Sequence, residues 1–267
     1  MRILVLDGGG QLGAFEWGAM CELKRQGIDY KFFDYYIATS AGAFNACFFL
    51  AEQFEEGKRI WLEHVPSGFW KPLKNDMNYL EKILTTIEPL DCKAIASRTQ
   101  KIYTTLTNAK TQKGDYLPLD QANKIIAFLL AGCSMPFLSG PRKIGNVFYY
   151  DGGLVAQPPI EKALEFEPAE IWVISTKPAG YRVNSILWKA AALLNAKARE
   201  LLYNYPEQQN KIMEIIDGQN NFKIIRPNKP LPLGFRSNNK PLIKETFALG
   251  QEAANKFLNT NLGKEIL

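Results

Sequence analysis

The chain of 267 residues lacks long hydrophobic runs. The longest, at residues 125–133, is far shorter than the roughly 20 residues that a membrane-spanning helix needs. A basic segment followed by an apolar leader is also missing, because the first residues already have the pattern of a strand. We therefore expect neither a membrane-spanning segment nor a signal peptide, so that any contact with a membrane would be peripheral.

Cysteine is scarce and scattered. The four cysteines, Cys21, Cys47, Cys92 and Cys133, form no CxxC pair, and several lie within apolar helical patterns. This spacing argues against a zinc site or a disulfide framework and favours buried, reduced thiols. Reduced thiols are typical of the cytoplasm, which is the expected localisation. We expect no cofactor and no metal.

An excess of charge of one sign is also missing. Lysine and arginine outnumber aspartate and glutamate by five, and 22% of the residues are charged, which is ordinary for a globular domain. No basic pattern interleaved with aromatic residues is present, so we expect no nucleic-acid partner. The 46% of hydrophobic residues suffices for a sizeable core.

The order of the apolar patterns predicts an α/β protein. Short Val- and Leu-rich runs indicate strands, and the amphipathic or wholly apolar segments between them indicate helices. The expected strands cover residues 2–7, 35–39, 101–107, 146–150, 170–175 and 222–225. The expected helices cover residues 15–25, 41–54, 78–86, 124–132, 160–166, 193–217 and 244–258, with a loop at 65–73.

This alternation implies a three-layer α/β/α fold around a central, mostly parallel sheet. No internal repeat, low-complexity tract or linker divides the sequence. We therefore expect a single domain over residues 1–267.

The first glycine turn, DGGGQLG at residues 7–13, lies between a strand and a helix. Gly8, Gly10 and Gly13 satisfy the GxGxxG fingerprint of dinucleotide-binding folds, and Asp34 lies where that motif places its ribose-binding acid. Such a turn points backbone N–H groups at an anion. A pyrophosphate suits these donors, and so does the oxyanion of an ester under cleavage.

The second turn favours the ester. Residues 35–43 indicate a strand, a sharp bend at Ser40 and a helix, which is the context of the GxSxG nucleophile elbow. Ala38 replaces the first glycine of that pattern, and Gly42 retains the second. The alternative is that Ser40 only caps the following helix.

The third turn follows a later strand and presents a carboxylate. Asp151 precedes Gly152 and Gly153. Taken alone, an Asp-Gly pair is common in plain turns.

In combination, the three turns resemble the patatin-like phospholipase family. The segment AGCSMPFLSGPRKIGNVFYYDGG, residues 131–153, is similar to the small-residue, Ser and Pro run that leads into the family's DG[GA] motif. Residues 224–250 resemble the tail of bacterial members, so the resemblance covers nearly the whole chain.

The resemblance implies a lipid acyl hydrolase whose substrates are phospholipids, lysophospholipids or glycerides, reached at a transient membrane surface. It implies Ser40 as nucleophile and Asp151 as base. The implied oxyanion hole consists of Gly8, Gly9 and Gly10. The implied supporting positions are Gly13, Ala38, Gly42, Gly152 and Gly153.

The single histidine fits poorly into a Ser-His-Asp triad. His64 precedes Asp151 in the chain, whereas an ordinary hydrolase triad places its histidine after the acid. We expect His64 only to close a helix near its C-terminus. Asp7 is expected to brace the glycine turn, and Asp34 to be an ordinary loop carboxylate.

Two departures from the family pattern leave alternatives open. Leu12 stands where the family commonly has Arg or Lys, which favours a neutral acyl ester over a phospholipid, and Ala38 tightens the elbow. A catalytically silent, lipid-binding relative is therefore one alternative. A dinucleotide-binding oxidoreductase that uses the GxGxxG turn is another, and it rests on that turn rather than on these departures.

Aromatic and amphipathic segments are the candidates for lipid contact. Phe44, Phe48 and Phe49 follow the elbow and form either an acyl slot or plain core. Phe69 and Trp70, flanked by Lys71 and Lys74, either dock on a membrane surface or pack in the core. Residues 187–202 are interpreted as a lid or as a surface helix.

Overall fold

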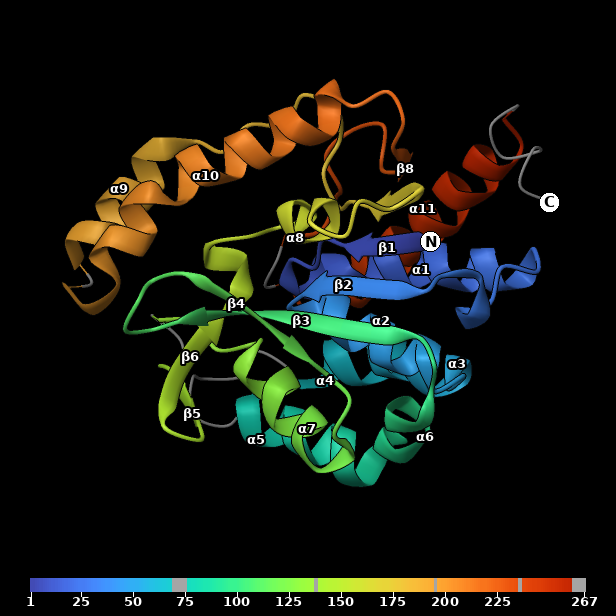
Figure 1. The fold of residues 1–267 in the computed structure, drawn as a ribbon, viewed down its shortest axis with the longest axis horizontal. Coiled ribbons are helices and arrows are strands. Elements are labelled where there is room, and N and C mark those ends of the chain that lie inside the picture. Colours follow the sequence, from blue (N-terminus) through green and yellow to red (C-terminus); the bar gives the residue numbers. More distant parts are fainter. Residues whose placement is uncertain (69–75, 137–138, 195, 235–236, 261–267) are drawn as a thin grey trace.

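A mixed eight-stranded sheet forms the middle layer of the protein (Figure 1). The computed structural model describes residues 1–68, 76–136, 139–194, 196–234 and 237–260. The strand order is β5-β6-β3-β2-β1-β7-β8, and β4 pairs with β3 beside this path. The strands are β1 (Arg2–Leu6), β2 (Tyr35–Thr39), β3 (Lys101–Asn108), β4 (Gly114–Pro118), β5 (Arg142–Ile144), β6 (Val147–Asp151), β7 (Glu170–Ile174) and β8 (Lys223–Ile225).

The centre of the sheet is parallel and one side is antiparallel. Strands β3, β2, β1, β7 and β8 run parallel to one another, whereas β4 and β6 run antiparallel to β3, and β5 runs antiparallel to β6. This architecture confirms the predicted three-layer fold. The prediction missed β4 and β5, because these short strands lack buried residues and therefore show no clear apolar pattern.

Helices cover both faces of the sheet. They are α1 (Gly13–Arg25), α2 (Ala41–Leu50), α3 (Phe54–Arg59), α4 (Val65–Gly68), α5 (Asp76–Lys82), α6 (Cys92–Ser97), α7 (Ala122–Ala131), α8 (Ile160–Leu164), α9 (Ser185–Leu194), α10 (Arg199–Gly218) and α11 (Lys240–Leu258). Short 3-10 helices are η1 (Gly10–Leu12), η2 (Tyr30–Phe32), η5 (Gly152–Leu154) and η6 (Ala196–Ala198), and π-helical turns are η3 (Ile60–His64) and η4 (Ile83–Ile87).

The predicted helix at 41–54 and the predicted loop at 65–73 are partly wrong. Helix α2 ends at Leu50, since Glu52 adopts a left-handed backbone (φ 60°) that a helix cannot continue through. Residues 65–68 are helical and directly follow the π-helical turn η3, so the chain continues as a helix where a loop was expected. The rest of that loop, residues 69–73, lies outside the described residues.

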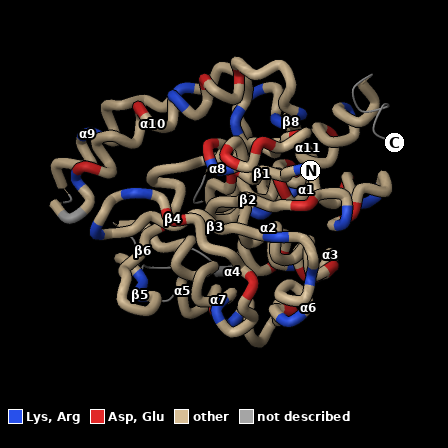
Figure 2. The backbone as a smooth tube through the Cα atoms, viewed as in Figure 1, with Lys and Arg blue, Asp and Glu red and all other residues tan. Residues whose placement is uncertain are grey.

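Alternate residues of β1 face two separate apolar cores. Leu4 and Leu6 belong to the larger core, which includes side chains of α1, α2, α7 and α11. Ile3 and Val5 face the opposite way, onto side chains of α8 and α10. Charged residues of both signs are interspersed over the outer helices and loops (Figure 2). No helix among the described segments is long and apolar enough to cross a bilayer.

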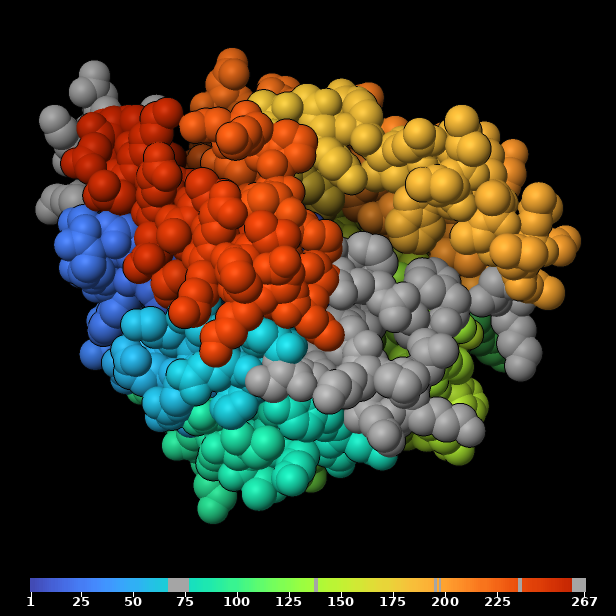
Figure 3. Space-filling model, turned by 180° about the vertical axis from the view of Figure 1, so that it is seen from behind, coloured from blue at the N-terminus to red at the C-terminus, as the bar shows by residue number. Residues whose placement is uncertain are grey.

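Helices α1 and α11 cross at very close range, although they lie at opposite ends of the chain. A Cβ atom on Gly18 would collide with the carbonyl oxygen of Phe247, and one on Gly250 with that of Phe15. Seen from behind, the red C-terminal helix lies against the blue N-terminal elements (Figure 3). This crossing fixes α1, and with it the glycine turn from which α1 begins.

Candidate active site

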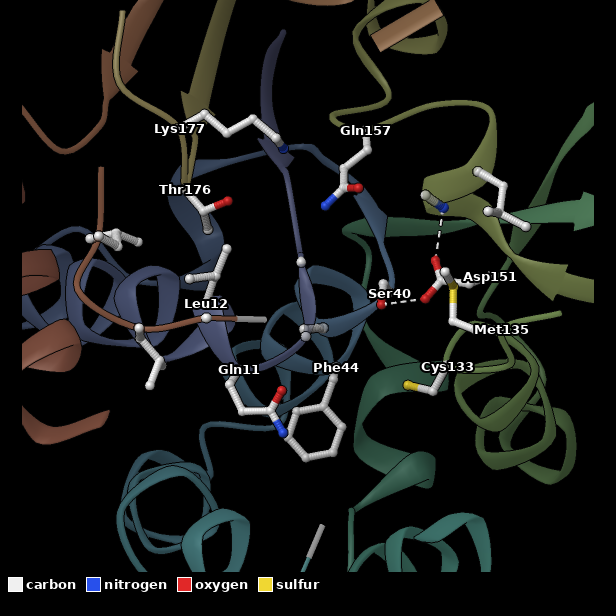
Figure 4. Close-up of a pocket in the computed structure, with 18 of the residues that line it drawn as sticks. Gln11, Leu12, Ser40, Phe44, Cys133, Met135, Asp151, Gln157, Thr176 and Lys177 are labelled. Carbon is white, nitrogen blue, oxygen red and sulfur yellow. Dashed lines mark hydrogen bonds between the residues drawn. The ribbon is translucent and has the colours of Figure 1, made fainter. Parts of the chain in front are cut away.

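Two strands that flank β3 end at the same level of the sheet. Thr39, the last residue of β2, pairs with Thr105 of β3, and Asp151, the last residue of β6, pairs with Leu106. Strand β2 reaches this level from one direction and β6 from the other. Ser40 and Asp151 therefore meet above β3 (Figure 4).

Ser40 occupies a strained bend between β2 and α2. Its backbone angles, φ 53° and ψ −126°, are rarely adopted by a residue with a side chain, and its hydroxyl makes no capping bond to α2. A Cβ atom on Gly42 would lie 2.9 Å from Leu6 Cβ and 3.2 Å from Gly8 N, which leaves room only for glycine. Ala38 is fully buried, and its methyl group packs into the core. The bend has the strain and close strand-to-helix approach of a nucleophile elbow rather than a simple helix cap.

The Ser40 side chain is paired with a carboxylate. Ser40 Oγ donates to Asp151 Oδ2 at 2.7 Å, and the Gly153 N–H donates to the other carboxylate oxygen, Oδ1, at 2.8 Å. The backbone of Asp151 is also held, since its N–H donates to the Ser134 carbonyl and its carbonyl accepts from Thr107 Oγ1. These bonds fix the carboxylate in position to accept the serine proton.

Burial changes the acidity of this carboxylate. It raises the pKa of Asp151 from 3.8 to about 6, although the bonds from Gly153 and Ser40 act in the opposite direction. Asp151 is therefore mainly ionised at neutral pH but is a stronger base than an exposed aspartate. A base of this kind suits the deprotonation of an alcohol during its attack on an ester.

The first glycine turn presents two free donors rather than the three that we expected. The N–H of Gly8 donates to Glu16 Oε1 at 2.8 Å, so Gly8 is committed inside the protein. The N–H groups of Gly9 and Gly10 have no acceptor among the described residues, and both glycines line the same cavity as Ser40. The geometry thus corrects the expectation for Gly8 and leaves Gly9 and Gly10 as candidate oxyanion donors.

Two buried acids brace this turn in different ways. Asp7 is fully buried and forms an ion pair with Lys177 Nζ at 2.6 Å, while the backbone N–H and hydroxyl of Thr176 donate to its second oxygen. The predicted bracing role of Asp7 is confirmed.

Glu16, the second acid, was missed by the sequence analysis. Burial, followed by repulsion from Asp7, raises the pKa of Glu16 to about 8, against hydrogen bonds from Gly8 and Asn45. Glu16 is therefore mainly uncharged at neutral pH, and it anchors Gly8 without placing an anion beside the free N–H donors. The available signal was a lone acid in the first turn of a helix that is otherwise apolar there.

A cavity of about 420 Å³ extends from the Ser40–Asp151 pair. Phe44 lines it, whereas Phe48 and Phe49 are fully buried in the core. Its walls are mainly apolar: Leu12, Phe44, Ile60, Trp61, Val65, Met77, Leu80, Met135, Leu154, Tyr181, Val183, Trp188, Tyr205, Leu231 and Leu233. Such a lining suits an acyl chain.

The remaining candidates lie elsewhere. The His64 ring pairs with Glu88 at 3.2 Å and does not line the cavity in the described part of the chain. Asp34 accepts from the Arg2 N–H at the start of β2, whereas the glycine turn lies at the opposite ends of these parallel strands. A ribose-binding role for Asp34 is therefore excluded by geometry. The aromatic loop at residues 69–74 lies outside the described residues.

A strained serine elbow, a buried carboxylate partner and free N–H donors on a three-layer α/β/α fold are features that serine acyl hydrolases share. A family model described as "Patatin-like phospholipase" matches residues 4–164. The chain belongs to this family, as the motifs predict. At the level of the family, it is a member of a group of lipid acyl hydrolases.

Two relatives illustrate how far this similarity extends. The chain is 24% identical over 277 residues to "Uncharacterized protein YjjU" of Escherichia coli strain K12, covering 96% of this chain and 77% of that protein. The crystal structure of VipD from Legionella pneumophila superposes with a TM-score of 0.55 and 13% identity over 96% of this chain. The match spans 66% of the VipD chain, and at this identity it shows the shared fold alone.

Proposed function

We propose that this protein hydrolyses fatty-acyl esters through a Ser40–Asp151 dyad. The observation that carries the proposal is the 2.7 Å hydrogen bond from Ser40 Oγ to Asp151, made at a strained elbow beside an apolar cavity. Membership of the patatin-like phospholipase family supports a lipid ester as the substrate.

The reaction begins with proton transfer from Ser40 Oγ to the Asp151 carboxylate as the oxygen attacks the ester carbonyl. The N–H groups of Gly9 and Gly10 bind the negative oxygen of the tetrahedral intermediate. When the intermediate collapses, the alcohol leaves with the proton from Asp151, and the acyl group remains on Ser40. Asp151 then takes a proton from the water that attacks the acyl-enzyme. It returns this proton to Ser40 Oγ as the fatty acid leaves, which restores the free enzyme.

Electrostatics in the turn support this direction of charge transfer. The Asp7 charge is neutralised by Lys177, and the raised pKa of Glu16 keeps that acid mainly uncharged. During the attack, negative charge moves from the Asp151 carboxylate to the ester oxygen, which the Gly9 and Gly10 N–H groups bind. Neither Asp7 nor Glu16 places an uncompensated negative charge beside these donors. The burial of Ser40 and Asp151 strengthens these interactions, because little water screens them.

The substrate class follows from the lining of the cavity. An acyl chain fits the apolar walls, and Leu12, which also lines the cavity, offers no positive charge to a phosphate. We propose a neutral glyceride ester ahead of a lysophospholipid or phospholipid, taken from a membrane surface in the cytoplasm. We further propose that residues 1–267 act as one domain, because the site draws on β1, β2 and β6 together.

Hydrolysis of p-nitrophenyl esters of increasing acyl length tests this proposal. Ser40→Ala and Asp151→Asn should each reduce turnover at least about a thousandfold while the protein stays folded. Asp34→Asn is the matched control and should retain activity, because Asp34 lies at the start of β2, at the opposite end of the strand from Ser40. The wild-type rate should rise with pH as Asp151 ionises, reach half its maximum near pH 6 and level off about one pH unit higher.

Wild-type turnover that survives either dyad substitution would contradict the mechanism. Absence of turnover on every ester, with lipid vesicles present, would instead favour a silent lipid-binding relative. Tight NAD(P) binding without esterase activity would favour the oxidoreductase alternative.

A further inference from the structure

Helix α9 exposes an unusual concentration of large apolar side chains. Ile186, Leu187, Leu193 and Leu194 are 73%, 74%, 74% and 90% exposed, and Tyr203 of α10 is 54% exposed. The other large exposed apolar side chains of the described residues lie singly on separate elements, such as Phe148 on β6 and Leu164 on α8. Single exposed apolar residues are ordinary, whereas a contiguous group marks an interaction site.

The opposite side of α9 is also apolar, but it is covered. Ala192 is buried, and the Trp188 ring lies 4.0 Å from the Tyr205 ring of α10, centroid to centroid. A helix that is apolar on nearly all sides is normally buried on all sides. Packing on α10 explains only the inner side of α9, so the outer leucines require a second apolar environment.

The inner side of α9 belongs to the candidate active site. Trp188 and Tyr205 line the same cavity as Ser40 and Asp151. Helix α9 thus contributes one side chain to the cavity wall and exposes others to the outside. An apolar molecule that touches the outer leucines lies within one helix diameter of the cavity wall.

The charged residues near this exposed apolar surface are mostly basic, which favours a negatively charged partner. The described side chains of residues 185–205 include two cations, Lys189 and Arg199, and one anion, Glu200, so their net charge is +1 (2 − 1). Helix α9 itself has no acidic residue. The segment forms one end of the molecule, gold in the space-filling view and with basic residues in the charge view (Figures 2 and 3). Leucines with neighbouring cations are typical of segments that insert at the surface of an anionic bilayer.

We propose that the α9 surface, defined as Ile186, Leu187, Leu193, Leu194 and Tyr203, docks the protein on a phospholipid bilayer that contains anionic lipid. The leucines enter the acyl region, and Lys189 and Arg199 lie at the level of the headgroups. Docking in this way brings the α9 wall of the cavity to the lipid. The delivery of substrate rests on the proposed acyl hydrolase function, whereas the docking itself does not.

Co-sedimentation with vesicles of phosphatidylcholine and phosphatidylglycerol tests the docking. The full-length Ser40→Ala protein is used as the background, so that lipid turnover cannot affect binding. Adding Leu193→Gln and Leu194→Gln should weaken partitioning by at least about tenfold, because two leucine side chains no longer leave water. Phe148→Gln with Leu164→Gln, which removes two exposed apolar residues elsewhere, is the matched control and should bind normally.

Binding should also weaken on vesicles of phosphatidylcholine alone, because the cations then have no anionic partner. Equal binding of the Leu193/Leu194 variant and its background would overturn the proposal, as would absence of binding by the background. A dimer in size-exclusion chromatography that the leucine substitutions dissolve would assign the α9 surface to a second copy of the chain instead.

Assays of the protein that retains Ser40 on a soluble short-chain ester distinguish an effect on docking from an effect on catalysis. The Leu193/Leu194 variant should cleave that ester at the wild-type rate while losing turnover of vesicle lipid. If neither protein cleaves any ester but only the leucine variant fails to bind vesicles, the proposed function fails and the docking surface stands.

Discussion

The glycine turn and the α9–α10 hairpin border the same cavity but are held by different forces. Around the turn, buried acids accept several hydrogen bonds each, as Asp7 does from Thr176 and Lys177, and Glu16 from Gly8 and Asn45. The hairpin is held by apolar contacts, including the Trp188–Tyr205 pair, and it exposes leucines to water. Hydrogen bonds are directional, so they hold the glycine turn in one position beside the proposed dyad. The apolar contacts between α9 and α10 leave the outer leucines of α9 exposed, where they can bind lipid.

The largest loss of stability is expected when the ion pair of the turn is broken. Lys177→Met removes the partner of the fully buried Asp7 and leaves an uncompensated charge in the interior. The free energy of unfolding should fall by about 3–5 kcal/mol at pH 7, measured by urea denaturation. A loss below about 1 kcal/mol would show that the turn does not depend on this pair.

Substitution of the proposed dyad carboxylate, Asp151, is expected to raise the free energy of unfolding instead of lowering it. The folded-state pKa of Asp151, about 6, lies above its ordinary value of 3.8, so its ionised form opposes folding. That cost is absent below about pH 4, grows as pH rises, and is complete above about pH 6. Asp151→Asn should therefore raise the free energy of unfolding at pH 8 by up to about 3 kcal/mol and have little effect at pH 4.

Urea titrations of the wild type and Asp151→Asn at these two pH values measure the difference. A variant that is less stable than the wild type at pH 8 would contradict the raised pKa. The expected result is a variant that is more stable than the wild type but has little turnover. It would show that the buried Asp151 carboxylate, which catalysis needs, lowers the stability of the protein.

Glu16 offers a smaller test of the bonded turn. Glu16→Ala leaves the buried N–H of Gly8 without its acceptor and should cost about 1–3 kcal/mol of unfolding free energy. Glu16→Gln keeps an acceptor oxygen and should stay close to wild type at pH 7, because the acid is mainly uncharged there. Thermal and urea unfolding measure the free energy of unfolding of the two variants. An equal loss of this free energy in both variants would rule out the hydrogen-bond explanation.

The smallest effect on stability is expected at the hairpin. Leu193→Gln with Leu194→Gln removes side chains that already lie in water, so the free energy of unfolding should change by less than about 0.5 kcal/mol. A loss of 2 kcal/mol or more, roughly the value for burying a leucine, would mean that these residues pack inside the protein.

Local patterns in the sequence were sufficient to find the candidate residues. Ser40 and Asp151 each follow a strand with a clear apolar run, and small residues surround both turns. The contact between the two depends on the antiparallel pairing of β6 with β3, which joins residues more than 40 positions apart. A short apolar run does not specify such a pairing, so only the combination of three motifs indicated that the turns meet.

The partners of individual polar groups could not be predicted in this way. The Gly8 N–H was expected to face the substrate, but α1 folds back over the turn and presents Glu16 to it. The segment at 187–202, expected to be a surface helix or a lid, is divided in the structure between α9, which begins at Ser185, and α10, which begins at Arg199. The apolar pattern continues across this division, so it did not show where one helix ends and the next begins.

The most direct test of the dyad is covalent labelling with a long-chain alkyl fluorophosphonate, read by peptide mass spectrometry. The reagent reacts with a serine hydroxyl that a neighbouring base activates. We predict one adduct, on Ser40, formed fast in the wild type and Asp34→Asn and at least about a hundredfold more slowly in Asp151→Asn. An adduct on another residue, or labelling of Ser40 at an unchanged rate in Asp151→Asn, would contradict the central claim that Asp151 activates Ser40.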